Sequence, residues 1–382
     1  MPSTQKFAYT NQKKVKCFVR NLLHVGFMIG SSNIQYVTPT LADYGDKWQV
    51  KKWIEAWLGN RQQRVCMRGQ GSSWRSVTSG VPQGSVLGPI LFLIFINDID
   101  CGVINWILKF ADDTKLFGIV NTASEAAVLQ KDVDTLCTWA ADWQMKFNVD
   151  KCKTMHIGSA NNRFGYNMNG QRLEEINNEK DLGIIIRNDL KVSEQCQQAC
   201  NKANRMLGLI RRTISSRNPV ILTRLYKSLV RPHLEYNSVA WSPFYKKDKE
   251  MIEKVQHRFT RFFGFLRKID YDIRLRKLGL WTLEERRNRA DLIEVFKMCH
   301  WLSALSLNTF FTRDLDSRTR GHCYKLRKIY SKSEPRFHFF SNRVINRWNN
   351  LPQEAVTLTT VESFKNQLQK IKNTQIGFFK DN

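Results

Sequence analysis

The chain has 382 residues, and its 60 lysines and arginines outnumber its 34 aspartates and glutamates, giving a formal net charge of +26. A hydrophobic fraction of 42% excludes wholesale disorder, and the length allows roughly two or three domains. The cationic surplus predicts a polyanionic partner, with nucleic acid favoured over an anionic membrane surface. A protein that is merely basic is the remaining alternative.

No targeting or membrane-spanning segment is visible. The N-terminal residues are polar and basic, and the longest apolar run, residues 86–96, is too short to span a bilayer. We therefore expect an intracellular protein of the nucleus or cytoplasm that does not enter a membrane. The nine cysteines lack the spacing of a disulfide framework. Cys196 and Cys200 lie one helical turn apart, as do Cys152 and His156, but buried thiols are a better interpretation than zinc ligands.

The first part of the chain mixes helices with hairpins. Apolar residues recur at helical spacing from Trp48 until Gly59, whereas later segments alternate or contain turn residues. The predicted elements are a helix over 48–58, a β-hairpin over 61–79 around Gly69-Gln70-Gly71, a turn-rich loop over 80–85, an apolar helix up to Asn97, and a second hairpin over 104–119.

A longer helix and two short strands follow, and then the chain becomes helical and basic. The helix is predicted over 123–147, with strands near 153–158 and 182–187. The core residues of the helix over 123–147 are expected to be Ala127, Leu136, Trp139, Ala140 and Trp143. Two later helices each have an apolar stripe. The first stripe consists of Ala199, Ala203, Met206, Leu207 and Ile210. The second helix is predicted over 248–263, and its stripe consists of Ile252, Val255, Phe259 and Phe262. The order predicts an α+β fold, with a mixed unit followed by a helical unit.

Two adjacent carboxylates, Asp112 and Asp113, are expected at the tip of the second hairpin. Their like charges repel, so the pair suits a site that a cation occupies. Oxygen ligands of this kind suit Mg²⁺, which binds through one or two carboxylates together with substrate phosphates. An ordinary Asp-Asp turn is the alternative, because aspartate is common in turns.

The surrounding motifs favour the metal site. They are SGVPQGSVLGPILFLIFINDI (79–99), KFADDTKLF (109–117), WQMKFNVDKCKTMHIG (143–158), KDLGIII (180–186), WIEAWLGNRQQRV (53–65), RLYKSLVRPHLEYNSVAW (224–241) and FFSNRVINRWNNLP (339–352). In order and spacing they resemble the reverse transcriptases of non-LTR retrotransposons, of the jockey and CR1-like kind. The resemblance covers roughly residues 41–370. It implies an RNA-directed DNA polymerase that acts on an RNA template, a DNA primer and deoxynucleoside triphosphates.

The resemblance also assigns roles to single residues. Asp112 and Asp113 would be the catalytic ligands of two Mg²⁺ ions, and Lys151 would protonate the departing pyrophosphate, unless it is only a surface lysine. The residues that would position template and nucleotide are Pro82, Gln83, Gly84, Ser85, Phe110 and Ala111. An ordinary strand-to-helix turn remains the alternative for the loop among them.

Further roles fall in the second half of the chain. Leu182 and Gly183 would grip the primer end. The basic helices resemble a thumb domain whose cations contact the nucleic-acid backbone, although a solvated helix face would show the same pattern. These cations are Lys202, Arg205, Arg211, Arg212, Lys254, Arg258 and Arg261.

The resemblance predicts a right-hand polymerase arrangement with most of the fingers missing. Residues 1–40 form a non-matching segment, 41–190 a partial palm, 191–295 a helical thumb-like domain, and 296–382 the C-terminal region of the retrotransposon polyprotein. This pattern is expected of an N-terminally truncated copy.

One residue that the family requires is missing. A further palm aspartate should fall near residues 20–30, where the sequence has no acid, and Asp43 and Asp46 are better interpreted as helix-capping or surface residues. We therefore expect the palm sheet to lack a central strand and the enzyme to be weak or inactive. The alternatives are a non-catalytic nucleic-acid-binding remnant with a basic thumb, and a chain that does not fold stably.

Overall fold

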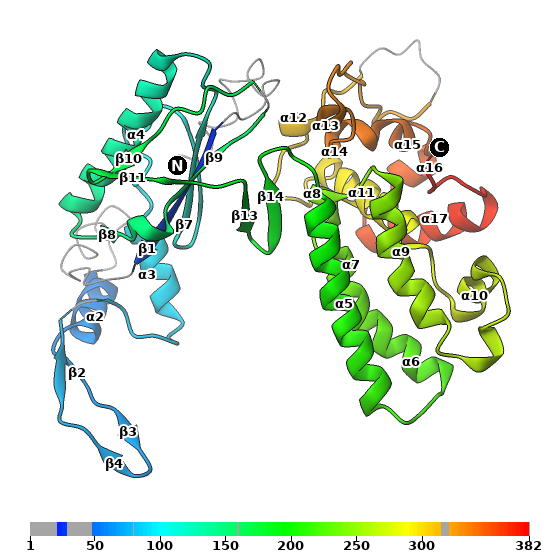
Figure 1. The fold of residues 1–382 in the computed structure, drawn as a ribbon, viewed down its shortest axis with the longest axis horizontal. Coiled ribbons are helices and arrows are strands. Elements are labelled where there is room, and N and C mark those ends of the chain that lie inside the picture. Colours follow the sequence, from blue (N-terminus) through cyan, green and yellow to red (C-terminus); the bar gives the residue numbers. More distant parts are fainter. Residues whose placement is uncertain (1–20, 29–47, 79, 159, 315–320, 382) are drawn as a thin grey trace. The chain divides into compact units, whose positions relative to one another are not determined.

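The computed structural model describes residues 21–28, 48–78, 80–158, 160–314 and 321–381. They divide into two compact units, one ending at Glu179 and the other beginning at Lys180. The first unit combines a sheet with helices and the second is mainly helical, which confirms the α+β class (Figure 1). Asp43 and Asp46, predicted to cap a helix or lie on the surface, fall outside the described residues. No described helix is long and apolar enough to cross a membrane.

The first unit is built on one main sheet. Its strands follow the order β12-β9-β1-β7-β6, and β8 pairs with the end of β1. All neighbours are antiparallel except β12 and β9, which are parallel. The strands are β1 (Asn21–Met28), β6 (Trp106–Phe110), β7 (Asp113–Gly118), β8 (Lys146–Phe147), β9 (Lys153–His156) and β12 (Glu174–Glu175).

Strand β1 corrects one expectation from the sequence. The sheet was predicted to lack a central strand, but β1 pairs with β7 on one side and with β9 on the other. Its sequence, NLLHVGFM, is mostly apolar, and its backbone pairs as an inner strand although it has no acid. The backbone edges of β7 and β9 are therefore covered, and the expected exposure of the sheet was wrong.

Helices α3 (Leu87–Phe95) and α4 (Ala123–Asp142) share a core with this sheet (Figure 1). The capping box at Thr122 and Glu125 satisfies backbone N–H groups where α4 begins. The helix ends at Asp142, not near 147 as predicted, because the chain turns back to pair as β8 with β1. Of its predicted core residues, Leu136, Trp139 and Ala140 are buried, Trp143 is partly buried, and Ala127 is exposed.

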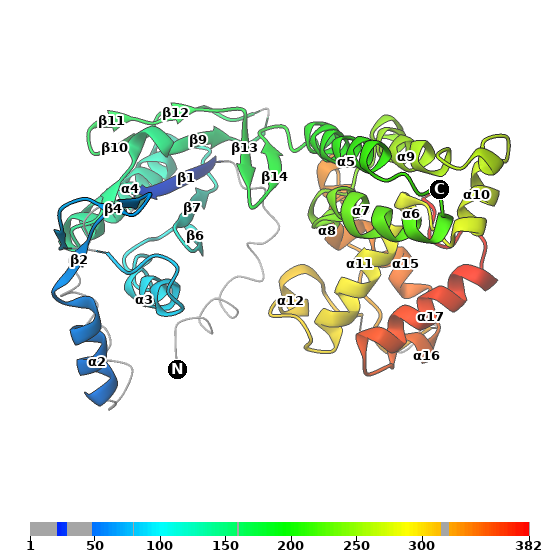
Figure 2. The same ribbon diagram turned by 90° about the horizontal axis from the view of Figure 1, so that it is seen from below.

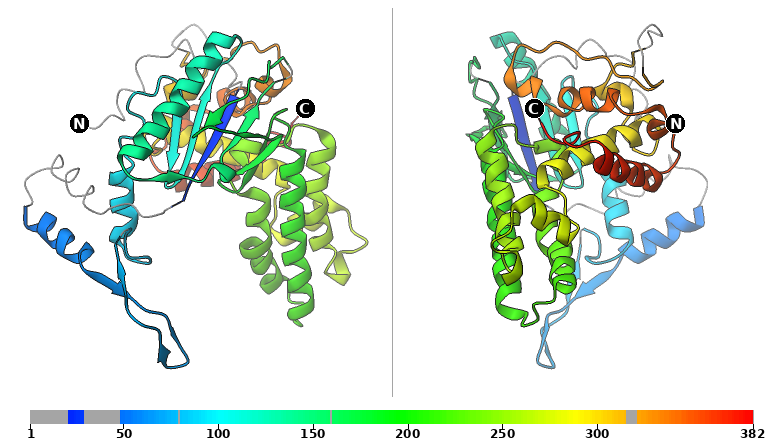
Figure 3. Two further views of the ribbon diagram at one scale, coloured as in Figure 1. Left: turned by 60° about the vertical axis from the view of Figure 1, so that its left-hand side comes forward. Right: turned by 90° about the vertical axis from the view of Figure 1, so that its right-hand side faces the viewer.

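A hairpin arm extends from the first unit (Figures 1 and 3). It follows α2 (Trp48–Leu58), and both elements were predicted. Its paired strands are β2 (Arg61–Gln63) with β5 (Arg75–Val77), and β3 (Cys66–Met67) with β4 (Gln70–Gly71). The tip is Arg68-Gly69, where both φ angles are positive, as two-residue hairpin turns of type I′ require. The guanidinium of Arg64 lies 4.7 Å from the ring centre of the exposed Trp74.

In the second unit, α5 (Ser193–Thr213) and α9 (Lys246–Thr260) lie side by side (Figure 2). Their predicted apolar stripes are buried, apart from Met206 and Phe262, which are partly buried. Helix α9 ends at Thr260, not at 263, because a 3-10 turn over Gly264–Leu266 follows and Phe263 enters the core. Other elements round this core are α6 (Pro219–Leu225), the π-helical turn η4 (Tyr226–Val230), α7 (Arg231–Glu235) and α10 (Tyr271–Leu278).

A second core of this unit lies round α11 (Leu283–Cys299) and α17 (Val361–Thr374). Phe296 and Phe364 stack there with ring centres 4.3 Å apart. The buried carboxylate of Asp291 accepts two hydrogen bonds from Arg343, at 2.8 and 2.9 Å. Both oxygens are thus paired with a cation, which offsets the cost of burying the charge. Shorter helices complete this part: α8 (Ser238–Trp241), α12 (Leu307–Phe310), α13 (Glu334–Phe337), α14 (Phe340–Arg343), α15 (Ile345–Asn349) and α16 (Gln353–Val356).

The carboxylate of Asp132 on α4 forms hydrogen bonds to the residues just before strand β6, and a substitution can test this contact. It is fully buried and accepts 2.8 Å hydrogen bonds from the backbone N–H groups of Ile104 and Asn105 and from the Asn105 amide. We expect Asp132→Ala to lower the free energy of unfolding by about 1–3 kcal/mol, because these donors would lose their acceptor. Urea unfolding measures the loss.

Asp134→Ala is the matched control, since Asp134 is an exposed residue of the same helix whose carboxylate accepts a hydrogen bond from the Gln130 side chain on the helix surface. Its cost should stay within about 0.5 kcal/mol. Equal losses for the two variants would contradict the anchoring role of Asp132.

Candidate active site

The predicted carboxylate hairpin is present. Phe110 pairs with Asp113, so Ala111 and Asp112 form a two-residue loop between β6 and β7. Ala111 has φ = 51°, a left-handed conformation that costs a residue with a Cβ about 1–2 kcal/mol. Asp112 is exposed at the tip, and Asp113 is partly buried at the start of β7. The tip therefore holds a strained backbone with a carboxylate directed away from the core, an arrangement found at many functional sites.

Contacts below the tip fix its position. The Lys109 ammonium donates to the Asp100 carboxylate at 2.8 Å and to the Asn97 carbonyl at 2.7 Å, tying β6 to the turns after α3. The indole of Trp139 donates to Asp98 in the same turns, at 3.1 Å. Together with Asp132, these bonds attach the hairpin to both helices, so the rigid part of the unit sets where the carboxylates lie.

A pocket of about 400 Å³ joins the hairpin tip to the glycine-rich loop. The loop and the tip are separated by more than twenty residues of sequence, yet both line this space. The loop contributes Gly80, Val81, Pro82, Gln83, Gly84 and Ser85, the tip contributes Ala111 and Asp112, and α3 contributes Gly88, Pro89, Leu91, Phe92 and Phe95. Phe110, Asp113 and Lys151 are not among its lining residues. The structure thus brings together Asp112 and most of the residues predicted to position template and nucleotide.

Close backbone packing gives the loop its shape. Gly80 and Gly84 have φ angles of 73° and 79°, which favour glycine. The Ser85 hydroxyl donates to the Pro82 carbonyl at 2.7 Å and accepts from the Gly88 N–H at 3.0 Å. A Cβ on Gly88 would lie 2.9 Å from this hydroxyl oxygen and 3.3 Å from the Pro82 carbonyl. Gly88 therefore allows α3 to approach the loop, a role that the VLGP motif carries but that sequence reasoning did not assign.

Strand β1 occupies the place where the further palm aspartate was expected. In the β1–β7 register, Gly26 lies opposite Asp113 and Val25 lies opposite Thr114. Directly opposite residues carry their side chains on the same face of a sheet. No acid is present along β1, and the described residues contain no group of three or more histidine, cysteine, aspartate or glutamate side chains placed to hold a metal ion.

Other predicted site residues lie on separate elements. Lys151 is exposed at the end of a 3-10 turn, Val149–Lys151. Leu182 and Gly183, with φ angles of 44° and 88°, form the turn between β13 (Asn178–Asp181) and β14 (Ile184–Arg187). The Tyr236 hydroxyl donates to the Leu182 carbonyl at 3.1 Å. Tyr236 was not predicted to support this turn, because 54 residues separate the two partners in sequence.

The predicted backbone-binding cations fall into two groups. Arg211, Lys254, Arg258 and Arg261 line one pocket of the second unit, whereas Lys202, Arg205 and Arg212 lie outside it. Arg217 and Arg267 also line this pocket and were missed, because they sit in loops where no helical period marks them.

The paired cysteines of α5 are buried thiols. Cys196 and Cys200 both lie in the core of the second unit. Burial raises the pKa of Cys196 to about 12 and that of Cys200 to about 11. Both therefore remain protonated at neutral pH, whereas a metal would require the thiolate form.

Comparison with known proteins agrees with this geometry. Residues 40–210 match the family model described as reverse transcriptase (RNA-dependent DNA polymerase). The chain contains a reverse transcriptase domain.

Curated relatives of this chain come from mobile elements of Drosophila. The chain is 28% identical over 251 residues to the RNA-directed DNA polymerase from mobile element jockey of Drosophila melanogaster, and 26% identical over 250 residues to that of Drosophila funebris. It is 27% identical over 256 residues to the probable RNA-directed DNA polymerase from transposon BS of Drosophila melanogaster. These alignments cover 59%, 60% and 62% of the chain. They cover only 27%, 27% and 28% of the relatives, so the chain spans about a quarter of their length.

The contact between Gly88 and Ser85 gives a test of the pocket loop. We expect Gly88→Ala to lower the free energy of unfolding by about 1–3 kcal/mol, because the added methyl group has no room. In a Ser85→Ala background the nearest atom is gone, so the same substitution should cost less. Urea unfolding of the two single variants and the double variant measures this coupling. An equal cost in both backgrounds would show that the loop does not pack on Gly88 as described.

Proposed function

We propose that this chain carries the polymerase centre of a retrotransposon enzyme that extends a DNA 3′ end on an RNA template. The observation that carries the proposal is the pocket in which Asp112 meets the loop of Pro82, Gln83 and Gly84. In this proposal the loop positions the template base and the incoming deoxynucleoside triphosphate. Its positive-φ glycine, Gly84, has no atom within 4 Å of the place of a Cβ, so a substrate can approach the backbone there.

The donor atoms at the tip suit one magnesium ion better than two. Asp112 and Asp113 offer adjacent carboxylates, which fits an ion that takes one or two protein carboxylates and fills its shell with phosphate oxygens and water. When bound, Mg²⁺ would favour ionisation of the attacking 3′-hydroxyl and neutralise charge on the departing pyrophosphate. A second ion would need a further carboxylate from the neighbouring strand, and Gly26 supplies none.

Residues of the chain would complete the reaction. The 3′-oxygen attacks the α-phosphorus of the triphosphate, and the bond from that phosphorus to the bridging oxygen of the pyrophosphate breaks. Lys151 is proposed to protonate the pyrophosphate as it leaves, while Leu182 and Gly183 hold the primer end. The cations of α5 and α9 are proposed to contact the phosphates of the bound nucleic acid.

We further propose that this copy is a weak polymerase. Stabilising the charge of the transition state is the main contribution of such an enzyme, and each missing ligand reduces it. The glycine opposite Asp113 supports this proposal, because the strand is in place and only the carboxylate is absent. A nucleic-acid-binding protein without catalysis is the second candidate, favoured by the same glycine together with the cationic pocket of the second unit.

Restoring the carboxylate tests both proposals. We expect weak, Mg²⁺-dependent primer extension by the unaltered chain, and a loss of about a hundredfold or more in Asp112→Asn. Gly26→Asp should raise the extension rate by about tenfold or more, since it adds a carboxylate on the face of Asp113. The measurement is incorporation of deoxynucleotides into a DNA primer annealed to RNA.

Gly26→Asn is the matched control, with nearly the same volume and no charge, and it should not raise the rate. If Gly26→Asp and Gly26→Asn behave alike, the missing carboxylate is not what limits this copy. If neither the unaltered chain nor Gly26→Asp extends a primer, while both bind nucleic acid, the second candidate function holds.

A further inference from the structure

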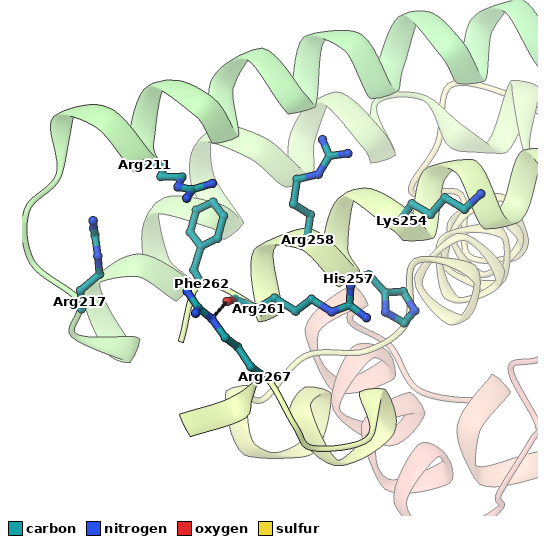
Figure 4. A pocket seen from close by; sticks show the side chains of 8 residues that line it. All are labelled: Arg211, Arg217, Lys254, His257, Arg258, Arg261, Phe262 and Arg267. Atoms are coloured by element: carbon teal, nitrogen blue, oxygen red, sulfur yellow. Dashed lines mark hydrogen bonds between the residues drawn. The ribbon is translucent and has the colours of Figure 1, made fainter. Parts of the chain in front are cut away.

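The second unit contains a pocket of about 640 Å³ with an unusual concentration of positive charge. Figure 4 shows its side chains round one space between the end of α5, the C-terminal half of α9 and the turn after α9. Six permanent cations, one histidine and one aromatic ring line it, and no acid does. They are Arg211, Arg217, Lys254, His257, Arg258, Arg261, Phe262 and Arg267.

These cations have no carboxylate partners in the described part of the chain. None of the six takes part in an ion pair there, and the hydrogen bonds of three of them go to neutral acceptors. Arg258 donates to the Asn204 amide oxygen at 2.7 Å, Arg217 to a backbone carbonyl at 2.6 Å, and Arg267 to a backbone carbonyl at 3.3 Å. Like charges that line one pocket repel one another unless a ligand or salt ions of opposite charge offset them.

The helix ends do not neutralise this charge. The C-terminus of a helix is equivalent to about half a negative charge, so α5 and α9 together offset about one cation of the six. Arg274, behind His257, adds another positive charge. Its side chain is 3% exposed, and its Nε and Nη1 atoms have no hydrogen-bond partner among the described residues. The pocket is therefore built for a ligand with several negative charges.

The shape of the pocket decides between kinds of polyanion. A duplex carries its phosphates on the outside of a stiff rod, and a rod contacts a ridge of cations but does not enter a concave space. A single strand is flexible and can bring successive phosphates into one pocket. The Arg211 guanidinium lies 5.8 Å from the ring centre of Phe262, and such a layered pair offers a flat surface on which a base can stack.

We propose that this pocket binds a single-stranded segment of nucleic acid, with its phosphates among the six cations and a base stacked on the Arg211–Phe262 pair. This inference rests on the proposed contact between the cations of α5 and α9 and nucleic acid, and it adds the kind of strand that is bound and the stacked base. The site uses neither Asp112 nor Asp113. It holds a strand by its backbone and so anchors nucleic acid independently of catalysis.

Binding of a short fluorescent RNA strand of about ten nucleotides tests the proposal, with a blunt RNA–DNA duplex as competitor probe. The pocket variant is Lys254→Ala with Arg261→Ala, since neither side chain makes a described hydrogen bond or ion pair. The matched control is Arg276→Ala with Lys277→Ala, which likewise removes one arginine and one lysine, from exposed positions of α10 outside the pocket. Unchanged thermal unfolding of both variants shows that the unit remains folded.

We expect the pocket variant to lose about tenfold or more in affinity for the single strand, and its log–log salt slope to fall by about 1.4, or 0.7 for each lost phosphate contact. The control variant should retain most of this affinity, and Asp112→Asn should retain all of it. The proposal is overturned if the control loses as much as the pocket variant, or if the pocket variant weakens the duplex and the single strand equally. Binding of inorganic tripolyphosphate without binding of the RNA strand would overturn it as well.

The pKa of His257, which lines the same pocket, provides a second measurement of strand binding. Burial, Arg274 and Arg261 hold its pKa below the usual value, while Asp272 acts in the opposite sense and Tyr271 stacks on the ring. A strand whose phosphates offset Arg261 should raise this pKa, so the affinity should increase as the pH falls through the range between the free and bound values. Titration of the His257 ring protons by NMR, with and without the RNA strand, measures the shift. A pKa that does not move on binding would place the strand elsewhere.

Discussion

Strand β7 is hydrogen-bonded along both edges, to β6 on one side and to β1 on the other, and this pairing determines where the carboxylates lie. A strand held on both edges cannot shift its register without breaking two ladders. Asp113 is the first residue of this strand, and Asp112 precedes it at the turn. The side chains that can join these carboxylates in one site are therefore those of the two-residue turn and of the facing end of β1.

The two sides of this arrangement have different chemistry. On the side of the turn, Asp112, the strained Ala111 and the glycine-rich loop line one pocket. Hydrogen bonds of Asp132 and Lys109 attach the hairpin to the helices behind it. On the side of β1 the backbone pairing is complete, and Gly26 stands opposite Asp113. Packing and hydrogen bonding favour the sheet whether or not an acid is present there. A fold of this kind can therefore form without a carboxylate at that position.

Positive charge is distributed differently in the second unit. Apolar stripes on α5 and α9 bury one face of each helix, and four of the basic residues outside these stripes, Arg211, Lys254, Arg258 and Arg261, line one pocket. Burial of apolar surface stabilises the pair strongly enough to hold several like charges close together. The proposed binding of nucleic acid and the proposed catalysis thus use separate parts of the chain, the cationic pocket and the pocket of Asp112.

Features that depend on local pattern could be predicted from the amino-acid sequence alone. Helical and alternating periods predicted α2, the hairpin arm, the carboxylate hairpin and the stripes of α5 and α9, and the motifs predicted the reverse transcriptase domain. Tertiary structure decided which distant segments meet. It placed β1 between β7 and β9, set Gly88 against Ser85, and brought Arg217 and Arg267 to the cations of the helices. The reason is physical: periodicity reports which side of an element is buried, whereas the pairing of remote segments depends on shape and hydrogen bonding that no short stretch of sequence contains.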